Sequence, residues 1–494
     1  MDNKKLFWVV IIGVIVYFNI FFNDFAFDDK HFIVNNPDIK HVSIAKLFTQ
    51  DVRGVYRPVR EVFYAISYKL WGLNPLGYHL NSLIIHILAS ILVYKIAMQI
   101  FKKESTALVS ALFFAAHPLH TESVAFITAS FDIIGIVFVL AAFFLYVTER
   151  KFLSNVFFLL AAFTYELTLT LPLLLVLYDF CFKKIKIKKY ISYFAILLFY
   201  FSIRLFIIKV GMRNTGYPGG SFVTTMLTIT KSVVLYIKLL VFPIGLTLGH
   251  TFSLATSVFE PKVLISVILI LSLLTIAFLT KKEIIKFSIL WFFIALIPVL
   301  NIIPIQTPFE ERYAYLASIS FCMLLAWGIT QIKKEHIKII AIVLILLSYT
   351  FVTLDRNQDW KNDYTLFKKT VELSPDYAKG HNNLGYELIT REEYKEAEKE
   401  LKIAIQLNPT FSLAYSNLAL AYLLQNKNNE AIAQAENAIK QDAENDKSYA
   451  IICLAKINLR EIKEAEKNCK KALDINKNNE IAKDILEKIG RISI

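Results

Sequence analysis

Two adjacent aspartates, Asp28 and Asp29, follow an apolar stretch that is long enough to cross a bilayer, roughly Leu6 to Phe22. Neighbouring carboxylates at a membrane surface repel each other, which can raise the pKa of one of them. A carboxylate there could take a proton from an acceptor hydroxyl while a lipid-linked donor stays in the membrane. The same spacing also fits a solvated loop in which an aspartate caps a helix. Spacing alone leaves both interpretations open.

Further ionisable side chains lie at the ends of other apolar stretches, where a membrane protein usually avoids them. These residues are Arg57, His117, His120, Glu122, Asp132, Glu166 and Arg312. Such groups are candidates for function because burying charge near lipid is costly. We therefore expect most of them to share one cavity with the aspartates, open sideways to lipid and lined by Asp28, Asp29, Arg57, His117, Glu122 and Arg312.

The charged members of this set also have structural interpretations. Arginine binds phosphate through paired hydrogen bonds, so Arg57 and Arg312 could hold a phosphate group. Arg312 could instead pair with Glu310 or Glu311, its neighbours in the sequence. Glu166 could hold a helix bundle together rather than contact a substrate.

The segment from His117 to Glu122 offers two histidines and one carboxylate. These three residues could bind a divalent metal. The histidines could equally cap helices or form hydrogen bonds inside a bundle. We do not favour a metal site, and we expect no cofactor to be required.

Composition indicates a multi-pass membrane protein. The chain has 494 residues, of which 56% are hydrophobic and only 19% are charged. Soluble domains are usually 45–50% apolar, and this chain has too many apolar stretches for a single anchor. Its four cysteines lie far apart, without the CxxC spacing of a metal or redox motif: Cys181, Cys322, Cys453 and Cys469.

The net charge of +13 gathers in short clusters between the apolar stretches, at residues 102–103, 150–151, 183–189, 281–286 and 333–338. Lys4 and Lys5 precede the first stretch. Because the clusters alternate with spans, they indicate membrane orientation rather than binding of nucleic acid. The positive-inside rule then places these loops and the N-terminus in the cytoplasm.

About eleven membrane crossings follow from this pattern. They fall near residues 6–23, 79–101, 106–117, 130–148, 152–163, 168–182, 190–208, 262–280, 286–303, 313–332 and 336–354. We predict that 224–243 lies in the outer interface instead, because Lys231 and Lys238 fall on nearly one helical face. The C-terminus is then outside, and so is a long first loop at residues 24–78, which contains both aspartates.

A repeat domain is predicted after about Arg356, where the long apolar stretches end. Alanines recur every 34 residues, at Ala397, Ala431 and Ala465 and again at Ala404, Ala438 and Ala472. This period and the small residues are typical of tetratricopeptide (TPR) repeats. The repeats fall near 378–411, 412–445 and 446–479, with a degenerate leading helix before them and a capping helix at 480–490.

Repeats of this type form a solenoid with a groove for peptides or partner helices. The groove predicts a protein or peptide partner. Cys453 and Cys469 occupy the two helices of one repeat, so we expect their side chains to come into contact. In an oxidising compartment they could form a disulfide.

Taken together, these residues resemble a known family, the transmembrane and tetratricopeptide-repeat O-mannosyltransferases of the GT-C class of glycosyltransferases. The resemblance covers nearly the whole chain. The matching motifs are Phe27-Asp28-Asp29, Asn35-Asn36, Tyr56-Arg57-Pro58, Gly77-Tyr78-His79-Leu80-Asn81, His117-Pro118-Leu119-His120-Thr121-Glu122, Asp132, Glu166, Arg312-Tyr313, Arg356-Asn357 and Asp359-Trp360, together with the repeats.

Two positions depart from the family pattern. The family usually has Gly-Arg-Ala-Asp where this chain has Ala129-Ser130-Phe131-Asp132, and Lys-Glu where it has Tyr165-Glu166. Two cations are therefore missing at Ser130 and Tyr165. If those cations help to bind the donor phosphate, the change affects donor identity or activity.

The resemblance implies a donor sugar on a polyprenyl phosphate and transfer with inversion. Phosphate is a good leaving group, so one carboxylate has only to deprotonate the acceptor hydroxyl. Cations must stabilise the departing phosphate. We expect Asp28 to be the base, with Asp29 tuning it or binding the acceptor, and Arg57 and Arg312 to bind the phosphate. His117, His120, Glu122, Asp132 and Glu166 would line the site.

The sequence thus predicts an all-α protein of two domains. Residues 1–355 form a membrane-embedded glycosyltransferase domain of the cytoplasmic (inner) membrane, and residues 356–494 form a TPR domain outside it. The alternative from another class is a non-catalytic, membrane-anchored TPR scaffold for protein–protein interaction, which the missing cations favour.

Overall fold

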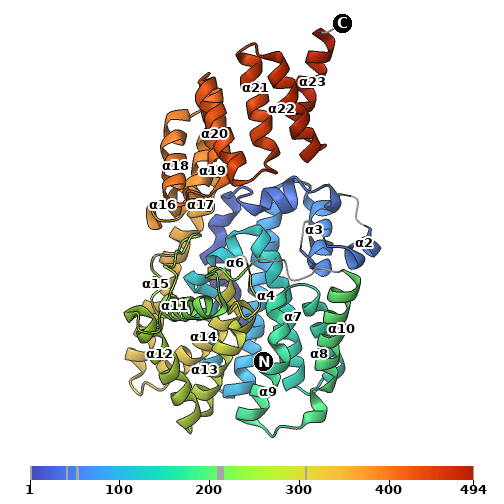
Figure 1. The fold of residues 1–494 in the computed structure, drawn as a ribbon. Coiled ribbons are helices and arrows are strands. Elements are labelled where there is room, and N and C mark those ends of the chain that lie inside the picture. Colours follow the sequence, from blue (N-terminus) through green and yellow to red (C-terminus); the bar gives the residue numbers. More distant parts are fainter. Residues whose placement is uncertain (1–2, 41–42, 52–54, 209–215, 306–308, 493–494) are drawn as a thin grey trace. The chain divides into compact units, whose positions relative to one another are not determined.

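The computed structural model describes residues 3–40, 43–51, 55–208, 216–305 and 309–492. Within this part of the chain, every regular element is a helix (Figure 1). The helices form two compact units, one of residues 1–248 and 252–362, the other of residues 363–494 with 249–251. The all-α class predicted from the sequence is confirmed for the described residues.

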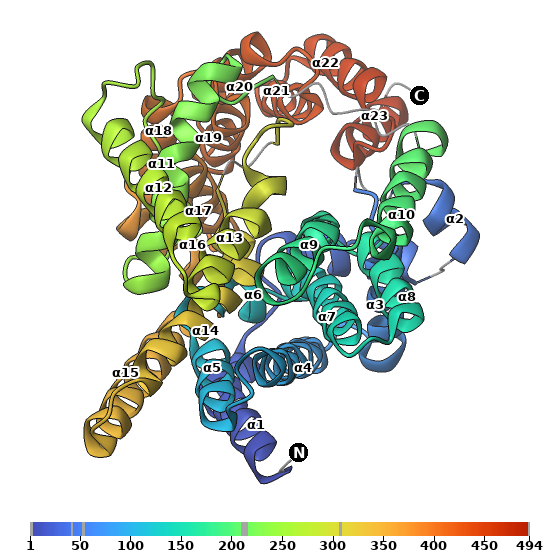
Figure 2. The same ribbon diagram turned by 90° about the horizontal axis from the view of Figure 1, so that it is seen from below.

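The first unit contains the α-helices from the N-terminus to residue 359. They are α1 (Asn3–Tyr17), α2 (Ile44–Thr49), α3 (Pro58–Trp71), α4 (Pro75–Phe101), α5 (Glu104–Ala116), α6 (Thr121–Ala125), α7 (Ile127–Val147), α8 (Lys151–Ala162), α9 (Leu171–Phe182), α10 (Ile191–Ser202), α11 (Phe222–Val241), α12 (Pro261–Leu279), α13 (Glu283–Leu296), α14 (Tyr315–Thr330) and α15 (Glu335–Asp359). Figure 2 looks along α4 and α7, which pack against each other.

Seven described helical segments are long and apolar enough to cross a membrane. They are Lys5–Phe22, Pro75–Phe101, Ile127–Val147, Phe222–Val241, Pro261–Leu279, Glu311–Thr330 and Glu335–Asp359. Shorter apolar helices, such as α5 and α8, lie at other predicted spans. The chain is therefore a helical membrane protein by composition and helix length, and the count of about eleven crossings stays a prediction.

Local sequence explains where several helices begin and end. Pro58 and Pro75 occupy the first turns of α3 and α4, where a missing N–H costs nothing. The Asn74 side chain caps α4 by accepting a hydrogen bond from the Leu76 N–H. Lys102 and Glu149 adopt positive φ angles of 50° and 61° and separate consecutive helices. These turns set α4 against α5 and α7 against α8.

The charge argument for placing 224–243 in the interface is weakened by the structure. Lys231 of α11 is only 9% exposed, and its ammonium group donates to the Ser253 carbonyl. A backbone carbonyl therefore accepts a hydrogen bond from this ammonium group, and the lysine does not need to reach water. The location of α11 in the interface stays a prediction.

The first outer loop predicted at 24–78 contains helical segments of its own, apart from 41–42 and 52–54, which lie outside the described residues. A short π-helix at Lys30–Val34 follows the two aspartates, and α2 and α3 complete the segment. Tyr64 and Tyr78 are fully buried, and their rings lie beside that of Phe131 of α7. The loop is thus packed on the bundle, and this packing fixes the position of the aspartates.

The second unit is a run of antiparallel helix pairs. After α16 (Asp363–Leu373) come α17 (Ala378–Thr390), α18 (Tyr394–Leu407), α19 (Ser412–Leu424), α20 (Asn428–Gln441), α21 (Asp446–Asn458), α22 (Ile462–Ile475) and α23 (Glu480–Ile492). The six periodic alanines are fully buried where paired helices meet. Only small side chains permit this close approach of the helices.

The predicted contact between Cys453 and Cys469 is confirmed. The two residues form a disulfide between α21 and α22, with their Cα atoms 5.4 Å apart. Both cysteines are fully buried in the core of the last repeat. Cys181 and Cys322, in the first unit, are free thiols.

Candidate functional site

Asp29 is held by the first residues of α7. Its side chain is 1% exposed. One carboxylate oxygen accepts hydrogen bonds from the Thr128 N–H at 2.7 Å and the Thr128 hydroxyl at 2.6 Å, and the other accepts from the Ala26 N–H at 3.2 Å. Asp29 therefore ties the aspartate segment to the start of a long buried helix.

Burial raises the pKa of Asp29 to about 7, although the hydrogen bonds from Thr128 and Ala26 favour its ionised form. The charge of Asp28 adds to the increase in the pKa of Asp29. Asp28 is half-buried and is the more accessible carboxylate of the pair. The geometry thus assigns anchoring to Asp29 and leaves Asp28 the better placed to meet a second molecule.

Phe126 links the aspartate segment to Arg312. Phe27 has a positive φ of 55°, and its ring centroid lies 5.9 Å from that of Phe126. The Arg312 guanidinium lies 5.7 Å from the centre of the same ring, and Trp360 stacks on it at 5.0 Å. The residue before Asp28 and the guanidinium of Arg312 therefore share one aromatic neighbour.

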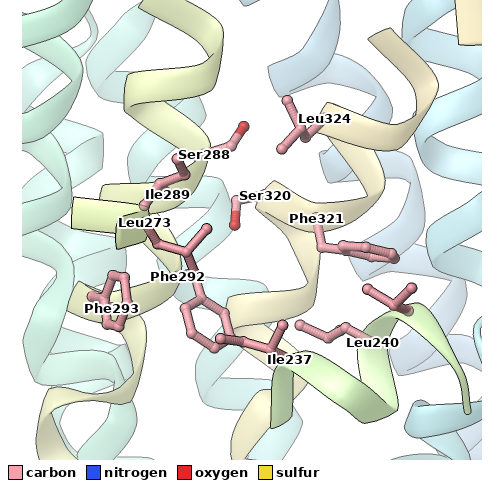
Figure 3. Close-up of a pocket in the computed structure, with 11 residues that line it drawn as sticks. Ile237, Leu240, Leu273, Ser288, Ile289, Phe292, Phe293, Ser320, Phe321 and Leu324 are labelled. Carbon is pink, nitrogen blue, oxygen red and sulfur yellow. The ribbon is translucent and has the colours of Figure 1, made fainter. Parts of the chain in front are cut away.

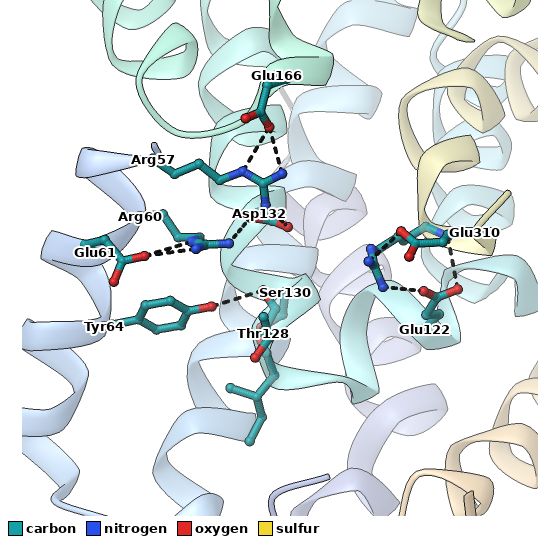
Figure 4. Close-up of polar contacts among 12 residues, drawn as sticks. Arg57, Arg60, Glu61, Tyr64, Glu122, Thr128, Ser130, Asp132, Glu166 and Glu310 are labelled. Carbon is teal, nitrogen blue, oxygen red and sulfur yellow. Dashed lines mark hydrogen bonds and ion pairs between the residues drawn. The ribbon is translucent and has the colours of Figure 1, made fainter. Parts of the chain in front are cut away.

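Arg312 belongs to a buried acidic cluster. It pairs with Glu122 at 2.7 Å and with Glu310 (Figure 4). The Tyr236 hydroxyl of α11 donates to the Glu310 carbonyl at 3.0 Å, which fixes the segment before Arg312. Pairing with Glu310 was one of the two alternatives left open by the sequence.

Arg57 lies between two carboxylates from other elements. It pairs with Asp132 of α7 and with Glu166, which begins the 3₁₀ helix Glu166–Thr170, both at 2.7 Å (Figure 4). Arg60, one turn later in α3, approaches Asp132 at 3.1 Å, and Arg204 approaches Glu166 at 3.3 Å. Three arginines thus surround two carboxylates.

Neighbouring arginines favour the ionised form of Glu166. Burial opposes ionisation of Glu166, but the charges of Arg57 and Arg204 outweigh it and lower the pKa of Glu166 to about 2. Glu61 pairs with Arg60 at 2.9 Å. The cluster therefore pairs three arginines with three acidic side chains.

Tyr64 connects the aspartate segment to the Arg57 cluster. Its hydroxyl donates to the Thr128 carbonyl at 3.3 Å, and the Arg60 guanidinium lies 5.3 Å from the centre of its ring. The Arg57 guanidinium lies 4.8 Å from the centre of the Tyr165 ring. The aspartate segment therefore adjoins the Arg57 cluster and, through Phe126, Arg312.

The two histidines lie inside the bundle. His117 and His120 are both 0% exposed. The His117 ring nitrogens bond to the Leu240 carbonyl and the Leu119 N–H, and those of His120 bond to the Phe114 carbonyl and the Ser318 hydroxyl. With both nitrogens engaged, these residues pack the helices together, as the structural alternative predicted.

The part of the chain that the structure describes contains no group of three or more His, Cys, Asp or Glu side chains arranged to hold a metal ion. Glu122, the third member of the possible metal triad, pairs with Arg312 instead. Its carboxylate is thus a partner for a cation supplied by the protein itself.

An apolar cavity of about 100 Å³ lies between α11, α12, α13 and α14 (Figure 3). Ile237, Leu240, Phe292 and Phe321 are among the residues that line it. Ile237 directly follows Tyr236, whose hydroxyl bonds to the Glu310 backbone. The helix that lines this cavity therefore also contacts the segment that carries Arg312.

Sequence reasoning missed Arg60, Arg204, Phe126 and Thr128. Arg60 lies one helical turn after Arg57, a spacing that places both on one face. Arg204 lies within the apolar stretch 190–208, where a lone arginine is itself a signal of function. Phe126 and Thr128 carry no such signal, because their role depends on how distant segments pack.

Two arginines pair with the carboxylates that follow the missing family cations in the sequence. Ser130 forms a hydrogen bond with Ser82 at 2.7 Å and carries no charge. Arg60 nevertheless reaches Asp132, and Arg204 reaches Glu166, the two carboxylates that follow the departures at Ser130 and Tyr165. The positive charge is therefore present but comes from α3 and from the segment after α10.

Known relatives cover most of this chain. It is 27% identical to Protein O-mannosyl-transferase F38B6.6 of Caenorhabditis elegans over 80% of its length and 61% of the relative's. It is 25% identical to the human Protein O-mannosyl-transferase TMTC3 over 79% of its length and 50% of the relative's. The chain thus spans about half to three fifths of the relatives it matches.

No protein-family profile matches the chain. Among solved structures, the TPR domain of Arabidopsis OM64 is 26% identical, with 24% of this chain and 96% of that chain covered and a TM-score of 0.23. The curated relatives confirm the resemblance that the motifs predict: this chain is a relative of the TMTC-type protein O-mannosyl-transferases.

Proposed function

We propose that this chain is an integral-membrane glycosyltransferase that moves a sugar from a polyprenyl-phosphate donor to a hydroxyl group of a protein. The sugar is mannose, as in the names of the relatives. The observation that supports the proposal is that Phe27, the residue before Asp28, and the half-buried Arg312 both contact the ring of Phe126.

The residues have complementary roles in one inverting step. Asp28 accepts the proton of the acceptor hydroxyl while the hydroxyl oxygen forms a bond to the anomeric carbon. The bond from that carbon to the phosphate oxygen breaks, and the phosphate leaves with the electron pair. Arg312 and Arg57 stabilise the negative charge on the departing phosphate. Asp29 positions Asp28 through its hydrogen bonds to Thr128.

The remaining proposed residues shape this site. Asp132, Glu122 and Glu166 orient the two arginines, and His117 and His120 fix the helices behind them. The apolar cavity beside Tyr236 supports a lipid-linked donor, since its lining suits a hydrocarbon chain. In this proposal, the transfer step requires no cofactor.

The proposed topology has about eleven crossings in the cytoplasmic membrane, with the N-terminus inside and transfer on the outer face. Residues 1–355 carry the chemistry, and residues 356–494 form a TPR domain outside. The disulfide between Cys453 and Cys469 supports a location of the TPR domain outside the cytoplasm, because disulfides persist in oxidising compartments. The TPR groove would present the protein acceptor.

One observation favours the alternative of a non-catalytic TPR scaffold. Arg57 and Arg312 are each already paired with two carboxylates, so a phosphate would have to share or displace these partners. A scaffold binds no phosphate, so its arginines could keep their carboxylate partners.

A transfer assay separates the two functions. Purified full-length chain is incubated with an acceptor protein and radiolabelled polyprenyl-phosphate mannose, or with a nucleotide-linked mannose as the control donor. We expect label on the acceptor only with the lipid-linked donor, and sensitivity to α-mannosidase, because inversion of a β-linked donor gives an α-linked product. No label with either donor, across several acceptors, would favour the scaffold.

A further inference from the structure

The loop between α9 and α10 combines strong positive charge with exposed apolar side chains. Residues 183–189 read Lys-Lys-Ile-Lys-Ile-Lys-Lys and contain five lysines and no acidic residue. Ile185 is 49% exposed and Ile187 is 78% exposed. A loop that only served solubility or orientation would have no reason to alternate isoleucine with lysine in this way.

Both ends of the loop are anchored. Lys183 pairs with Glu149 at 2.9 Å. At the other end, the buried carboxylate of Asp179 accepts hydrogen bonds from Tyr190 at 2.8 Å and Tyr146 at 2.6 Å, and Lys189 lies 3.8 Å away. The loop is therefore held in one conformation by groups of the bundle.

Between these anchors, three lysines have no acidic partner among the described residues. Lys184, Lys186 and Lys188 are all exposed, and no ion pair of the described structure includes them. Unpaired ammonium groups on one short loop attract an anion, because their mutual repulsion is relieved when a negative charge binds.

A cavity of about 390 Å³ adjoins these lysines. Its lining is formed by Val176, Ile185, Ile187, Tyr190, Ile191 and Phe194. The one hydroxyl among these side chains, that of Tyr190, already bonds to Asp179. The cavity therefore offers an apolar surface, which continues along α10 through the exposed Leu198.

We infer that the α9–α10 loop is a binding site for an anionic phospholipid. The headgroup phosphate lies among Lys184, Lys186 and Lys188, and an acyl chain enters the cavity beside Ile187 and Phe194. The lysines lie next to the apolar cavity, just as the charged headgroup of a phospholipid lies next to its acyl chains. An acidic peptide or nucleic acid would use the lysines but leave the cavity without an occupant.

This site is separate from the candidate transfer site. The segment Glu166–Thr170 leads directly into α9, and the loop follows the last residue of that helix. Twelve residues of α9 therefore separate Glu166–Thr170 from the loop, roughly 18 Å along the helix. The inference does not depend on the proposed function, and its test measures lipid binding without sugar transfer.

Native mass spectrometry of the full-length protein in detergent gives a direct test. Phosphatidylglycerol and phosphatidylcholine of the same acyl composition are titrated in parallel, with inorganic phosphate as a third ligand. We expect phosphatidylglycerol to bind at least tenfold more tightly than phosphatidylcholine. Equal binding of the two lipids, or full competition by inorganic phosphate at concentrations similar to those of the lipid, would overturn the inference.

Matched variants localise the site. Replacing Lys184, Lys186 and Lys188 with glutamine should weaken phosphatidylglycerol binding by roughly 100-fold, since each lysine contributes about fivefold at a charged surface. The control replaces Lys281, Lys333 and Lys334, three exposed lysines of other loops, and should change binding less than twofold. An equal loss in both triple variants would mean that only net charge matters and would refute a defined site.

A second pair of variants tests the cavity. Ile187→Ser should weaken binding of both phospholipids several-fold, because it removes apolar surface from the lining. Ile244→Ser, at a residue that is 72% exposed elsewhere in the first unit, should have no effect. Both isoleucines are exposed, so neither change should prevent folding, and unchanged binding in Ile187→Ser would exclude the acyl-chain contact.

Discussion

The two units of this protein place their charges in opposite ways. In the first unit, the side chains of Arg60 and Asp132 form an ion pair while only 1% and 6% exposed. In the second unit, Lys470 and Glu466 pair across one helical turn while 65% and 41% exposed. Exposed pairs contribute little to stability, whereas burying ions costs several kcal/mol that the pair only partly recovers.

This difference indicates where selection has acted on function. The second unit obtains its stability from small buried residues such as Ala397 and Ala431, and its charges serve solubility. The first unit keeps at least five buried or half-buried arginines and their carboxylates, although apolar residues would pack at lower cost. We propose that these charges persist because they bind the phosphate of the donor.

The largest effect should come from breaking the buried network. Arg57→Ala leaves Asp132 and Glu166 without their central partner, so we expect a loss of about 3–5 kcal/mol in the free energy of unfolding. Chemical denaturation of the purified protein measures the loss. Lys470→Ala is the control and should cost no more than about 0.5 kcal/mol. Similar losses in the free energy of unfolding for the two variants would show that ion pairs contribute equally to stability in the two units.

Removing the disulfide should have the next largest effect, confined to the second unit. The bridge closes a loop with a sequence separation of 16 residues, for which the expected loss on Cys453→Ser is about 3 kcal/mol. The melting transition of the full chain, with and without reductant, gives the measurement. Reductant should lower the melting temperature of the wild type but not that of the Cys453→Ser/Cys469→Ser variant. Equal sensitivity of both proteins would show that the bridge does not stabilise the repeat.

Asp29 makes the stability of the first unit depend on pH. Its pKa in the folded protein is raised to about 7, so the folded state binds more protons than the unfolded state between about pH 4 and pH 7. The contribution of neutral Asp29 to the free energy of unfolding is therefore fully present below about pH 4. It is lost as the pH rises through 7, because ionised Asp29 is less favourable in the folded protein than in the unfolded chain. Between pH 5 and pH 7 the wild type should lose about 2 kcal/mol relative to Asp29→Asn. Parallel unfolding curves for the two proteins over this range would contradict the buried, protonated carboxyl.

Two glycines offer a smaller test of packing in the two units. A Cβ atom on Gly385 of α17 would lie 2.5 Å from Leu401, whereas a Cβ atom on Gly328 of α14 would meet nothing within 4 Å. Gly385→Ala should cost about 1–2 kcal/mol after the gain in helix propensity. Gly328→Ala should be neutral or stabilising by up to about 1 kcal/mol. Thermal unfolding in the same detergent compares them, and a cost at Gly328 equal to that at Gly385 would refute the packing argument.

The repeats could be predicted from the sequence because their contacts are local. Each repeat packs mainly against its neighbours, so the period of 34 at Ala404, Ala438 and Ala472 specifies which faces meet. The same local logic placed Cys453 opposite Cys469, and the disulfide confirms it. Apolar helices were likewise identified from their length and composition.

The charge clusters could be predicted only in part, because their contacts join distant segments. Arg57 and Glu166 are 109 residues apart, and Arg312 and Glu122 are 190 apart. Sequence identified these residues as unusual but not their pairing, and it overlooked Arg60 and Arg204, which supply charge near Ser130 and Tyr165. The histidines were equally ambiguous, since a buried hydrogen-bonded imidazole and a metal ligand require the same residue type.

A rate measurement tests the proposal that Asp28 is the base of a transfer reaction. Initial rates of mannose transfer from the polyprenyl-phosphate donor are compared for purified wild type, Asp28→Asn and Asp24→Asn. Asp24 is an exposed aspartate four residues earlier and serves as the matched control. We expect Asp28→Asn to lower the rate by about 10²–10⁴-fold, the usual contribution of a general base, and Asp24→Asn to leave it within about twofold. Transfer by Asp28→Asn at the wild-type rate would exclude Asp28 as the base.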